Sequence, residues 1–403
     1  MFENLRSTIR FRSPSLPTAA SRLQRAANVD DLRAMAKRRL PGGVFDYIDG
    51  AAEDERALAR SQNAFGAVDF RPRVLRDMSQ VDYSATVLGR RIPFPFVLSP
   101  TGFSRIADSQ GELSVARAAA RAGLPYTLST LGTRSIEEVA AVSDGPKWFQ
   151  VYVWKDRGLV KEMVGRAQSA GFEAIVITVD FATLGRRERD VRRGFTMPPK
   201  IGLDTIVDGM MHPGWTLDFV QADPILFANL AGRGADGTEA VALGAYVDEQ
   251  LDPSLSWADM EWFRNVWDGP IVIKGIQDVD DASIAAEIGM DAIALSNHGG
   301  RQLDASPSPF DLLVPVRDRV GDSIEVLVDG GVRRGADIVK AMAQGATACM
   351  GGRAYLYGLG AAGEPGVDAA LTMLTSEVDR TMKLVGAASM TELDESYLQP
   401  APS

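Results

Sequence analysis

From about residue 94 onward, the chain repeats one pattern of apolar and polar positions, in which a short apolar run is followed by an alanine-rich segment with helical periodicity. Apolar runs of this kind are typical of parallel strands that are buried on both faces, and the segments between them are typical of covering helices. Eight such units within about 260 residues predict an α/β protein with a closed (β/α)8 barrel. The predicted strands are 96–99, 126–129, 148–152, 174–180, 271–275, 292–296, 325–329 and 347–351, and the predicted helices include 111–122, 135–142, 160–170, 278–288 and 335–344.

Several segments fall outside this pattern. Residues 1–25 hold five arginines and one acidic residue, which predicts a flexible basic arm, although the composition also weakly resembles a transit peptide. A helix is expected at 30–39, with Asn28 or Asp30 as its N-cap and 41–43 as its end. A long insertion at about 181–257 separates the fourth and fifth strands and is typical of a lid, an interface or a disordered loop. The expected domains are therefore the arm at 1–25, one barrel domain at 26–390, which contains the insertion, and a C-terminal tail at 391–403.

Composition narrows the classes of function. Hydrophobic residues make up 45% of the 403 residues, which is enough for a large core, and the net charge of −10 argues against binding to nucleic acid. A single cysteine, Cys349, excludes an intramolecular disulfide and favours a reducing compartment, so we expect a cytoplasmic protein. No apolar run approaches the length of a membrane span. Only two histidines are present, far apart, so no metal centre is expected, although an all-carboxylate magnesium site stays open.

Polar residues gather at the carboxyl end of every predicted strand. In (β/α)8 barrels the active site lies at this end, so the pattern predicts a ligand site at the mouth of the barrel. In strand order, these residues are Ser99 to Thr101, Ser129 and Thr130, Gln150 and Tyr152, Thr178 and Asp180, Lys274, Ser296 to His298, Asp329 to Gly331, and Gly351 to Arg353.

The last two strand ends have the features of a phosphate site. Glycines at 330–331 and 351–352 allow backbone N–H groups to approach an anion, and each glycine pair is followed by an arginine at the start of a predicted helix. Phosphate binds at these positions in many barrels of this type. A GxGxxG string at 358–363 matches a dinucleotide fingerprint, but no βαβ unit follows it, so we do not expect a Rossmann site there.

The sixth strand end, Asn297 to Asp304, carries the residues best suited to proton transfer. His298 provides a base near neutral pH, and Arg301 provides a clamp for a carboxylate three residues later. Gly299 and Gly300 allow a tight turn, so that both side chains can face one pocket.

These residues together strongly resemble the FMN-dependent L-2-hydroxy-acid dehydrogenase and oxidase family, most closely its quinone-linked L-lactate dehydrogenases. The resemblance covers about residues 28–390, and the string SNHGGRQLD at 296–304 is its most specific part. The other strings are Phe45 to Tyr47, Gly50 with Glu53 to Glu55, Ser99 to Gly102, Phe149 to Tyr152, Thr178 to Asp180, Leu184 to Glu188, Lys274 and Gly275, Asp329 to Arg333, and Gly352 and Arg353.

The resemblance implies FMN as cofactor and a set of catalytic residues. His298 would take a proton as the hydroxy acid is oxidised, and Asp180 would pair with the imidazolium and raise its pKa. Tyr152 would bind the hydroxyl oxygen of the substrate, and Lys274 would lie at the pyrimidine edge of the flavin, where negative charge develops. The order of bond breaking, by hydride or by carbanion, is left open.

The resemblance also implies binding residues. Arg301, Arg187 and Tyr47 would hold the substrate carboxylate. The flavin ring and ribityl chain would contact Pro100, Thr101, Gly102, Ser129, Gln150, Thr178 and Ser296, while Asp329 would bind ribityl and Gly331, Arg333, Gly352 and Arg353 would bind the phosphate.

Two substrate-side positions differ from the glycolate oxidases of the family. Gly102 stands where alanine is usual, which is expected to open space near the flavin and argues against fast use of oxygen. Leu131 replaces a tryptophan and suits a methyl or somewhat larger substituent, although Phe103 and the insertion also shape the pocket. We therefore expect oxidation of L-lactate to pyruvate.

Several alternatives stay open. Within the family they are an oxygen-using lactate oxidase or monooxygenase, and a dehydrogenase for larger acids such as mandelate. From other classes they are a flavin-dependent isomerase and a non-catalytic FMN-binding protein. Expected partners are the small hydroxy acid, a quinone or membrane electron acceptor, and other copies of the chain in a homotetramer.

The insertion is more apolar than a solvated loop requires, because it contains Met210, Met211, Trp215 and the stretch 219–230. Exposed apolar patches often bind membranes, and tryptophan favours the bilayer interface. One hypothesis is that residues 205–230 form a peripheral contact with the inner face of a membrane. The alternative is that they pack against the barrel of the same chain or against another subunit.

Overall fold

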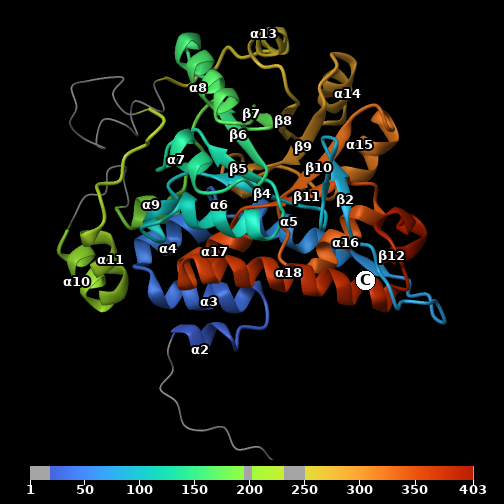
Figure 1. Ribbon diagram of the computed structural model, residues 1–403, viewed down its shortest axis with the longest axis horizontal. Coiled ribbons are helices and arrows are strands. Elements are labelled where there is room, and N and C mark those ends of the chain that lie inside the picture. Colours follow the sequence, from blue (N-terminus) through green and yellow to red (C-terminus); the bar gives the residue numbers. More distant parts are fainter. Residues whose placement is uncertain (1–18, 195–201, 231–249, 403) are drawn as a thin grey trace, which may run out of the picture.

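A computed structural model describes residues 19–194, 202–230 and 250–402 (Figure 1). Eight parallel strands form the closed barrel that the sequence predicts, in the order β10-β11-β4-β5-β6-β7-β8-β9. Their bounds agree closely with the apolar runs, because these side chains are buried on both faces of the sheet. The strands are β4 (Phe96–Thr101), β5 (Tyr126–Ser129), β6 (Lys147–Tyr152), β7 (Ala174–Thr178), β8 (Ile271–Ile276), β9 (Ala292–Ser296), β10 (Glu325–Asp329) and β11 (Ala348–Gly351).

A helix follows each strand and covers the outside of the barrel. The five helices predicted from periodicity are confirmed, and the structure adds α13 before β8, α15 after β9 and the pair α17 and α18 at the end of the barrel. The helices are α6 (Glu112–Arg121), α7 (Ile136–Ala141), α8 (Arg157–Ser169), α13 (Asp259–Val266), α14 (Val279–Glu287), α15 (Leu313–Val320), α16 (Gly335–Ala343), α17 (Arg353–Ala362) and α18 (Glu364–Val385).

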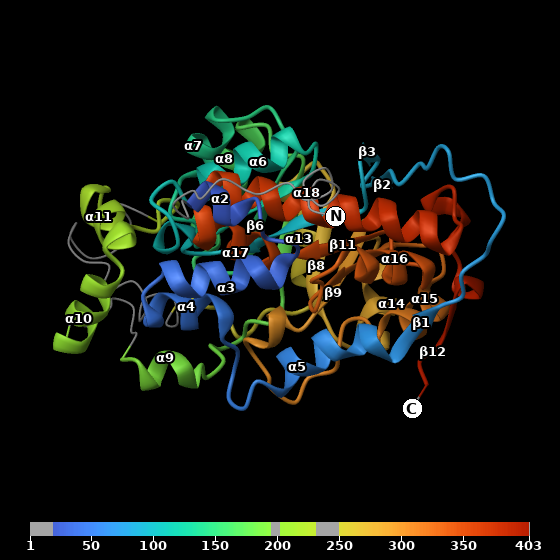
Figure 2. The same ribbon diagram turned by 90° about the horizontal axis from the view of Figure 1, so that it is seen from below.

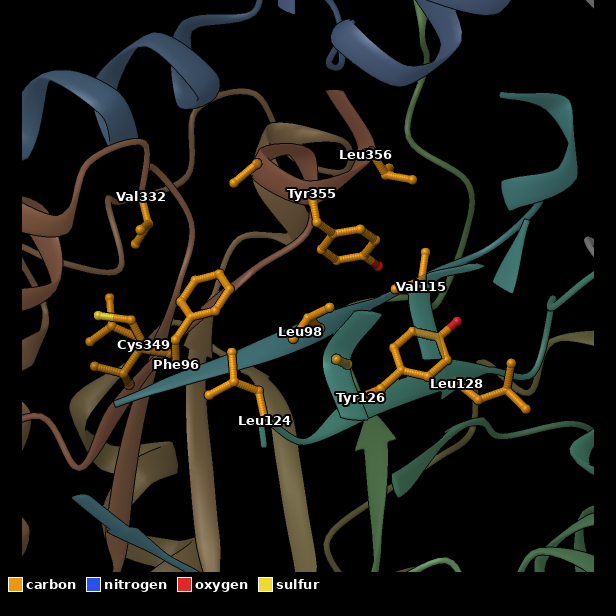
Figure 3. Close-up of a cluster of buried hydrophobic side chains, with 14 of the residues drawn as sticks. Phe96, Leu98, Val115, Leu124, Tyr126, Leu128, Val332, Cys349, Tyr355 and Leu356 are labelled. Atoms are coloured by element: carbon orange, nitrogen blue, oxygen red, sulfur yellow. The ribbon is translucent and has the colours of Figure 1, made fainter. Parts of the chain in front are cut away.

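The barrel has an inner and an outer core. Inward-facing residues such as Trp148, Val272 and Met350 fill the interior, and a hairpin of β2 (Ala85–Val87) and β3 (Arg90–Ile92) adds Val87 and Ile92 to this cluster. The outer core lies between the strands and the helices (Figure 3). There the hydroxyl of Tyr355, on α17, donates to the backbone oxygen of Ser99 over 2.7 Å and so ties α17 to β4.

The GxGxxG string at 358–363 lies within and just after α17. A Cβ on Gly358 would lie 2.2 Å from the backbone oxygen of Gly366, so this glycine permits α17 and α18 to touch. The string therefore serves helix packing, in keeping with the expectation against a Rossmann site.

The N-terminal segment contains more helix than expected. Residues 1–18 lie outside the described part of the chain, but α2 (Ala19–Leu23) occupies part of the predicted arm and packs against α17. Asn28 caps α3 (Val29–Arg39) by accepting from the N–H of Asp31. The prediction that residues 41–43 end this helix is confirmed, because α3 stops at Arg39, and the same residues also begin α4 (Gly42–Asp49), whose N-cap is Pro41. The next elements are α5 (Arg56–Asn63) and the 3-10 turn η1 (Ala64–Ala67).

Residues after 390 are part of the fold rather than a separate tail. β12 (Leu398–Pro400) pairs antiparallel with β1 (Val68–Phe70), and Tyr397 and Leu398 are buried. The short turns η4 (Met390–Glu392) and η5 (Glu395–Tyr397) lead to this pair. The expected boundary at 390 is therefore wrong, since burial of these side chains ties the segment to the domain.

The insertion after β7 forms a helical projection. Its described elements are α9 (Glu188–Arg192), α10 (Leu203–Met211) and α11 (Pro213–Gln221), and the last two project from the side of the barrel (Figures 1 and 2). The stretch 223–230 returns to the barrel, where Phe227 and Leu230 are buried. Among the described residues, no helix has the length and apolarity that a membrane span requires.

Candidate active site

A cavity of about 510 Å³ lies at the carboxyl ends of the strands. The structure brings together there nearly all of the residues expected from the sequence, although they come from segments between residues 47 and 353. The expected residues that line it are Tyr47, Pro100, Thr101, Gly102, Ser129, Leu131, Tyr152, Thr178, Arg187, Lys274, His298, Arg301, Asp329, Gly331, Arg333, Gly352 and Arg353.

Three expected residues lie just behind the cavity wall and support others. Gln150 accepts from the hydroxyl of Ser129 over 2.9 Å and donates to Thr178 over 3.0 Å. Ser296 and Asp180 hold side chains that do face the cavity. These residues are therefore placed to orient the lining of the site.

Both ring nitrogens of His298 have a hydrogen-bond partner. Its Nδ1 lies 3.0 Å from Oδ1 of Asp180, and its Nε2 lies 3.3 Å from the hydroxyl of Tyr152. Burial lowers the pKa of His298, while the Asp180 carboxylate acts in the opposite direction. Asp180 therefore raises the pKa of His298 as expected, but burial lowers this pKa by more. A neutral imidazole results, with Nε2 available to accept a proton.

The backbone at His298 and Gly299 is unusual for a helical turn. Both residues have positive φ, 57° and 64°, within the 3-10 turn η3 (His298–Gly300). A Cβ on Gly299 would lie 2.6 Å from Nη1 of Arg353. Strained backbone of this kind persists where function requires it, and here it points the imidazole into the cavity.

A buried network links four strand ends beneath the cavity. Lys274 lies 2.8 Å from Oδ2 of Asp329, and the hydroxyls of Ser99 and Ser296 donate to the same carboxylate over 2.6 and 2.8 Å. Burial lowers the pKa of Lys274, but Asp329 and Asp180 raise it by more, so the net direction is upward. The ammonium therefore stays charged, fixed at the base of the site.

Two arginines and a tyrosine lie on the side of the cavity that faces α4. Arg301 donates to the backbone oxygens of Tyr47 over 2.7 Å and Gly50 over 3.0 Å, and its guanidinium lies 5.0 Å from the ring of Tyr47. Burial and the neighbouring Arg187 lower the pKa of Arg301 to about 9. Nε of Arg187 is buried and has no hydrogen-bond partner among the described residues. Two desolvated cations in one wall predict an anionic ligand.

Arg353 occupies the start of α17. Its guanidinium donates to the backbone oxygens of Ile48, Gly50 and Gly299 over 3.0, 2.6 and 2.9 Å. Burial lowers its pKa, and Arg333 contributes in the same direction. Arg353 therefore combines a structural role with a cationic face toward the cavity.

Gly102 lies in close contact with Leu131. A Cβ there would lie 3.0 Å from Cβ and 3.1 Å from the backbone oxygen of Leu131. The glycine thus permits close contact between the β4 and β5 ends, and because Gly102 also lines the cavity, the expectation that it opens space near the flavin stays a prediction. An alanine would require Leu131 to shift by a few tenths of an ångström.

Sequence reasoning missed some residues of the cavity wall. Phe227 and Val191, from the insertion, line the cavity, as does Asp190 beside the two arginines. Burial raises the pKa of Asp190, while Arg301 and Arg187 oppose this change. In the sequence, Asp190 could have been suspected only because it follows Arg187 closely. Nothing in the sequence marks Phe227 as a cavity residue.

A charged cluster behind the site joins α4 to three other helices. Asp49 is 3% exposed and accepts from Arg33 (2.5 and 2.7 Å), from Arg189 of α9 (3.0 Å) and from the Tyr357 hydroxyl (2.8 Å). Burial raises the pKa of Asp49, but these donors outweigh it and lower the pKa to about 2. Because Arg187 precedes α9, this cluster fixes the part of the insertion that carries a cavity residue.

We expect Asp49→Asn to lower the free energy of unfolding by about 1–2 kcal/mol near neutral pH, because the buried carboxylate is lost to the partly exposed donors Arg33 and Arg189 and to the Tyr357 hydroxyl. A lowered pKa means that the stabilisation is present above about pH 4 and is lost as the pH falls toward 2. Urea unfolding at several pH values measures this difference. Asp54→Asn is the matched control, since Asp54 pairs with Arg56 at the surface and should change stability by less than about 0.5 kcal/mol. Equal effects of the two variants would contradict the prediction.

Comparison with known proteins agrees with this site. A family model described as FMN-dependent dehydrogenase matches residues 36–400. A protein of Mycobacterium tuberculosis that is provisionally named L-lactate dehydrogenase is 45% identical, over 98% of this chain and 94% of its own. The (S)-mandelate dehydrogenase of Pseudomonas putida is 40% identical, over 93% of this chain and 94% of its own. A crystal structure described as the monotopic membrane protein (S)-mandelate dehydrogenase has a TM-score of 0.90 at 40% identity and covers 93% of this chain and 100% of its own.

Proposed function

Because this chain belongs to the FMN-dependent dehydrogenase family, we propose that it oxidises an L-2-hydroxy acid to the 2-oxo acid, with L-lactate to pyruvate as its reaction. The observation that carries the proposal is the arrangement of His298, whose Nδ1 bonds to Asp180 and whose Nε2 faces the cavity beside Tyr152. A base, a hydroxyl-binding group and two cations in one cavity suit the loss of a proton from a hydroxy acid.

The residues present fit FMN. The start of α17, Gly352 and the cations Arg333 and Arg353 provide a place for its phosphate. Lys274 is a buried cation at the base of the same cavity, suited to the flavin's electron-rich edge. When bound, FMN accepts the two electrons that the substrate loses.

Proton transfer rests on two residues. Nε2 of His298 takes the proton of the substrate hydroxyl, and the carboxylate of Asp180 stabilises the imidazolium that forms. The hydroxyl of Tyr152 lies within hydrogen-bond reach of the same nitrogen and binds the substrate oxygen. Oδ2 of Asp180 is buried and has no hydrogen-bond partner in the described part of the chain, so the carboxylate can accept from a further donor.

Substrate recognition rests on the two arginines. Within residues 19–194, 202–230 and 250–402, the buried Nε of Arg187 has no hydrogen-bond partner, and a substrate carboxylate would satisfy it. Arg301 presents the remaining donors of its guanidinium from the same wall, and Tyr47 adds a hydroxyl. This arrangement orients the 2-carbon toward His298.

The test is anaerobic bleaching of the yellow holoenzyme with a panel of L-2-hydroxy acids. We expect the flavin to bleach with L-lactate and to stay oxidised with D-lactate. Failure to bleach with every L-2-hydroxy acid would overturn the proposal and favour an isomerase or a binding protein. Faster bleaching with L-mandelate would favour the alternative substrate class, for which the likeness to (S)-mandelate dehydrogenase is the specific observation. Rapid recovery of colour in air would show an oxidase or monooxygenase.

The proposal includes a cytoplasmic homotetramer that passes electrons to a quinone at the inner face of a membrane. One described surface supports the membrane contact in this proposal, and we call it the insertion surface. It consists of Ile206, Val207, Met210, Met211, Leu217, Phe219 and Val220 on α10 and α11, each at least 40% exposed. Trp215 belongs to the barrel side instead, because its Nε1 donates to the backbone oxygen of Ile106 over 2.8 Å. The structural neighbour described as monotopic supports the same view.

We expect the double variant Met210→Lys, Val220→Lys to lower vesicle binding at least tenfold, because each lysine replaces an apolar side chain that would leave water. Co-sedimentation with purely zwitterionic phospholipid vesicles, whose surface does not attract the added lysines, measures this, and bleaching by L-lactate should be unchanged. Leu384→Lys is the control, because Leu384 is 69% exposed on α18. A wild-type protein that does not bind vesicles would contradict the membrane proposal, and light scattering then tests whether the insertion surface lies between subunits of the tetramer.

A further inference from the structure

The apolar end of the cavity is built by two phenylalanines from distant parts of the chain. Phe103 follows β4, and Phe227 comes from the insertion; both line the cavity. Their ring centroids are 5.8 Å apart, and the ring of Phe103 lies 5.9 Å from that of Tyr47. The guanidinium of Arg301 lies 5.0 Å from the ring of Tyr47, so the aromatic end adjoins the cations that would hold a substrate carboxylate, and we place the 2-substituent of a bound hydroxy acid against it.

Phe103 is fixed by its own backbone. It has a φ of 62°, which is rare for a bulky residue, and its N–H donates to the backbone oxygen of Leu131 over 3.0 Å. Leu131 also lines the cavity. The β4 and β5 ends thus form a rigid half of the aromatic end.

Phe227 forms the other half, on a stretch that we call the strap, residues 223–230. Phe227 is 5% exposed although it lies in the insertion. The strap is held on the barrel by hydrogen bonds from both sides of this residue, so its ring has a defined position. These bonds run from Arg105 to the carbonyls of Asp223 (2.5 Å) and Pro224 (3.2 Å), from the Ala228 N–H to the Gly132 carbonyl (3.1 Å), and from the Ile136 N–H to Oδ1 of Asn229 (3.0 Å).

We propose that Phe227 is a specificity-determining residue that limits the size of the 2-substituent, so that the chain selects L-2-hydroxy acids with small aliphatic groups over those with aryl groups. This inference rests on the proposed function. With Phe103, the ring of Phe227 would bound the space open to a substituent larger than methyl, and this wall of two rings cannot yield without a shift of the strap. Phe103 is held more rigidly than Phe227, so the position of Phe227 on the strap sets the largest 2-substituent that fits.

Two substitutions should act in opposite directions. Phe227→Ala enlarges the aromatic end and should raise kcat/KM for L-3-phenyllactate relative to L-lactate about tenfold, since small volume changes in an apolar pocket discriminate by about this factor or more. Phe227→Trp reduces the space and should lower kcat/KM for L-2-hydroxy-4-methylpentanoate relative to L-lactate by a similar factor. Calorimetric titration with pyruvate and phenylpyruvate should show the same changes in relative affinity.

Phe219→Ala is the matched control, because Phe219 lies on the same insertion but stacks on Trp215, with centroids 4.8 Å apart, and is 40% exposed. Its substrate preference should equal that of the wild type. If the wild type oxidises L-2-hydroxy acids but both Phe227 variants keep its preference, this inference is wrong and the proposed function stands. If the wild type oxidises none of the acids, the proposed function itself is wrong. Should Phe227→Ala fail to fold, Phe227→Trp alone decides between these results.

Discussion

We expect His298→Gln to retain FMN and to reduce its flavin with L-lactate about 10²- to 10⁴-fold more slowly, which is the usual contribution of a general base. Glutamine keeps a polar group of similar size against Tyr152 but cannot accept a proton. The side chain is not expected to support the fold, because its ring bonds only to Asp180 and Tyr152 among the described residues. Stopped-flow absorbance of the flavin measures the rate, and the visible spectrum confirms that FMN remains bound.

The pH dependence of kcat/KM provides a second test of the same base. Burial places the pKa of His298 below its ordinary value of 6.5, and only the neutral imidazole accepts a proton. The rate should therefore fall as the pH decreases through a value below 6.5. Asp180→Asn removes the group that raises this pKa, so its acidic limb should move to lower pH while the maximal rate falls. A His298→Gln variant with near wild-type rates, or an unchanged limb in Asp180→Asn, would show that the base lies elsewhere.

The barrel and most of the site could be predicted from the sequence because both depend on local patterns. Strands that are buried on both faces must be continuously apolar, which is why 126–129, 292–296 and 325–329 match the structure at both ends. Active-site residues of such barrels follow the strands directly, so their positions in the chain reveal their common location. The SNHGGRQLD string then added the family, which no pattern of apolar residues could indicate.

Elements that were missed depend on exceptions to local rules. Pro315 disfavours a helix at 313–320, but it lies in the first turn of α15, where a proline is tolerated. Pro41 and Gly42 similarly separate two consecutive helices instead of ending one. The hairpin of β2 and β3 turns at Leu88 and Gly89, both with positive φ, and leucine is not a usual signal for such a turn.

The contacts made by the insertion could not be predicted from the sequence for a different reason. Phe227 contacts Phe103 across more than a hundred residues, and Asp49 meets Arg189 in the same way. Neither pair lies on a periodic face, and the surrounding residues have no spacing that distinguishes a buried strap from an exposed one. Met210 and Phe227 are both apolar residues of the same insertion, yet Met210 is 68% exposed and Phe227 is 5% exposed. Only the folded structure shows which apolar residues of the insertion lie on the surface and which line the cavity.

We expect Arg353→Ala to weaken FMN binding about 100-fold, because the phosphate would lose a buried, charge-assisted donor at the start of α17. The substitution also frees the carbonyls of Ile48, Gly50 and Gly299, so a loss of stability of the apoprotein alone would not prove the assignment. The informative quantity is the extra stability that FMN confers. At a concentration of 100 times the wild-type Kd, FMN should stabilise the wild type by about 2.7 kcal/mol and the variant by only about 0.4 kcal/mol.

Arg334→Ala provides the control for this measurement. Arg334 follows Arg333 directly but turns away to pair with Glu377 at the surface, with 45% of its side chain exposed. Its loss should leave the stabilisation by FMN at the wild-type value. Arg353→Lys, which keeps the charge but not the three-way donation to the backbone, should fall between the wild type and Arg353→Ala. If FMN stabilises Arg353→Ala as strongly as the wild type, the guanidinium serves only to join α4 to η3, and the phosphate is held by Arg333 and the backbone of the glycine turns.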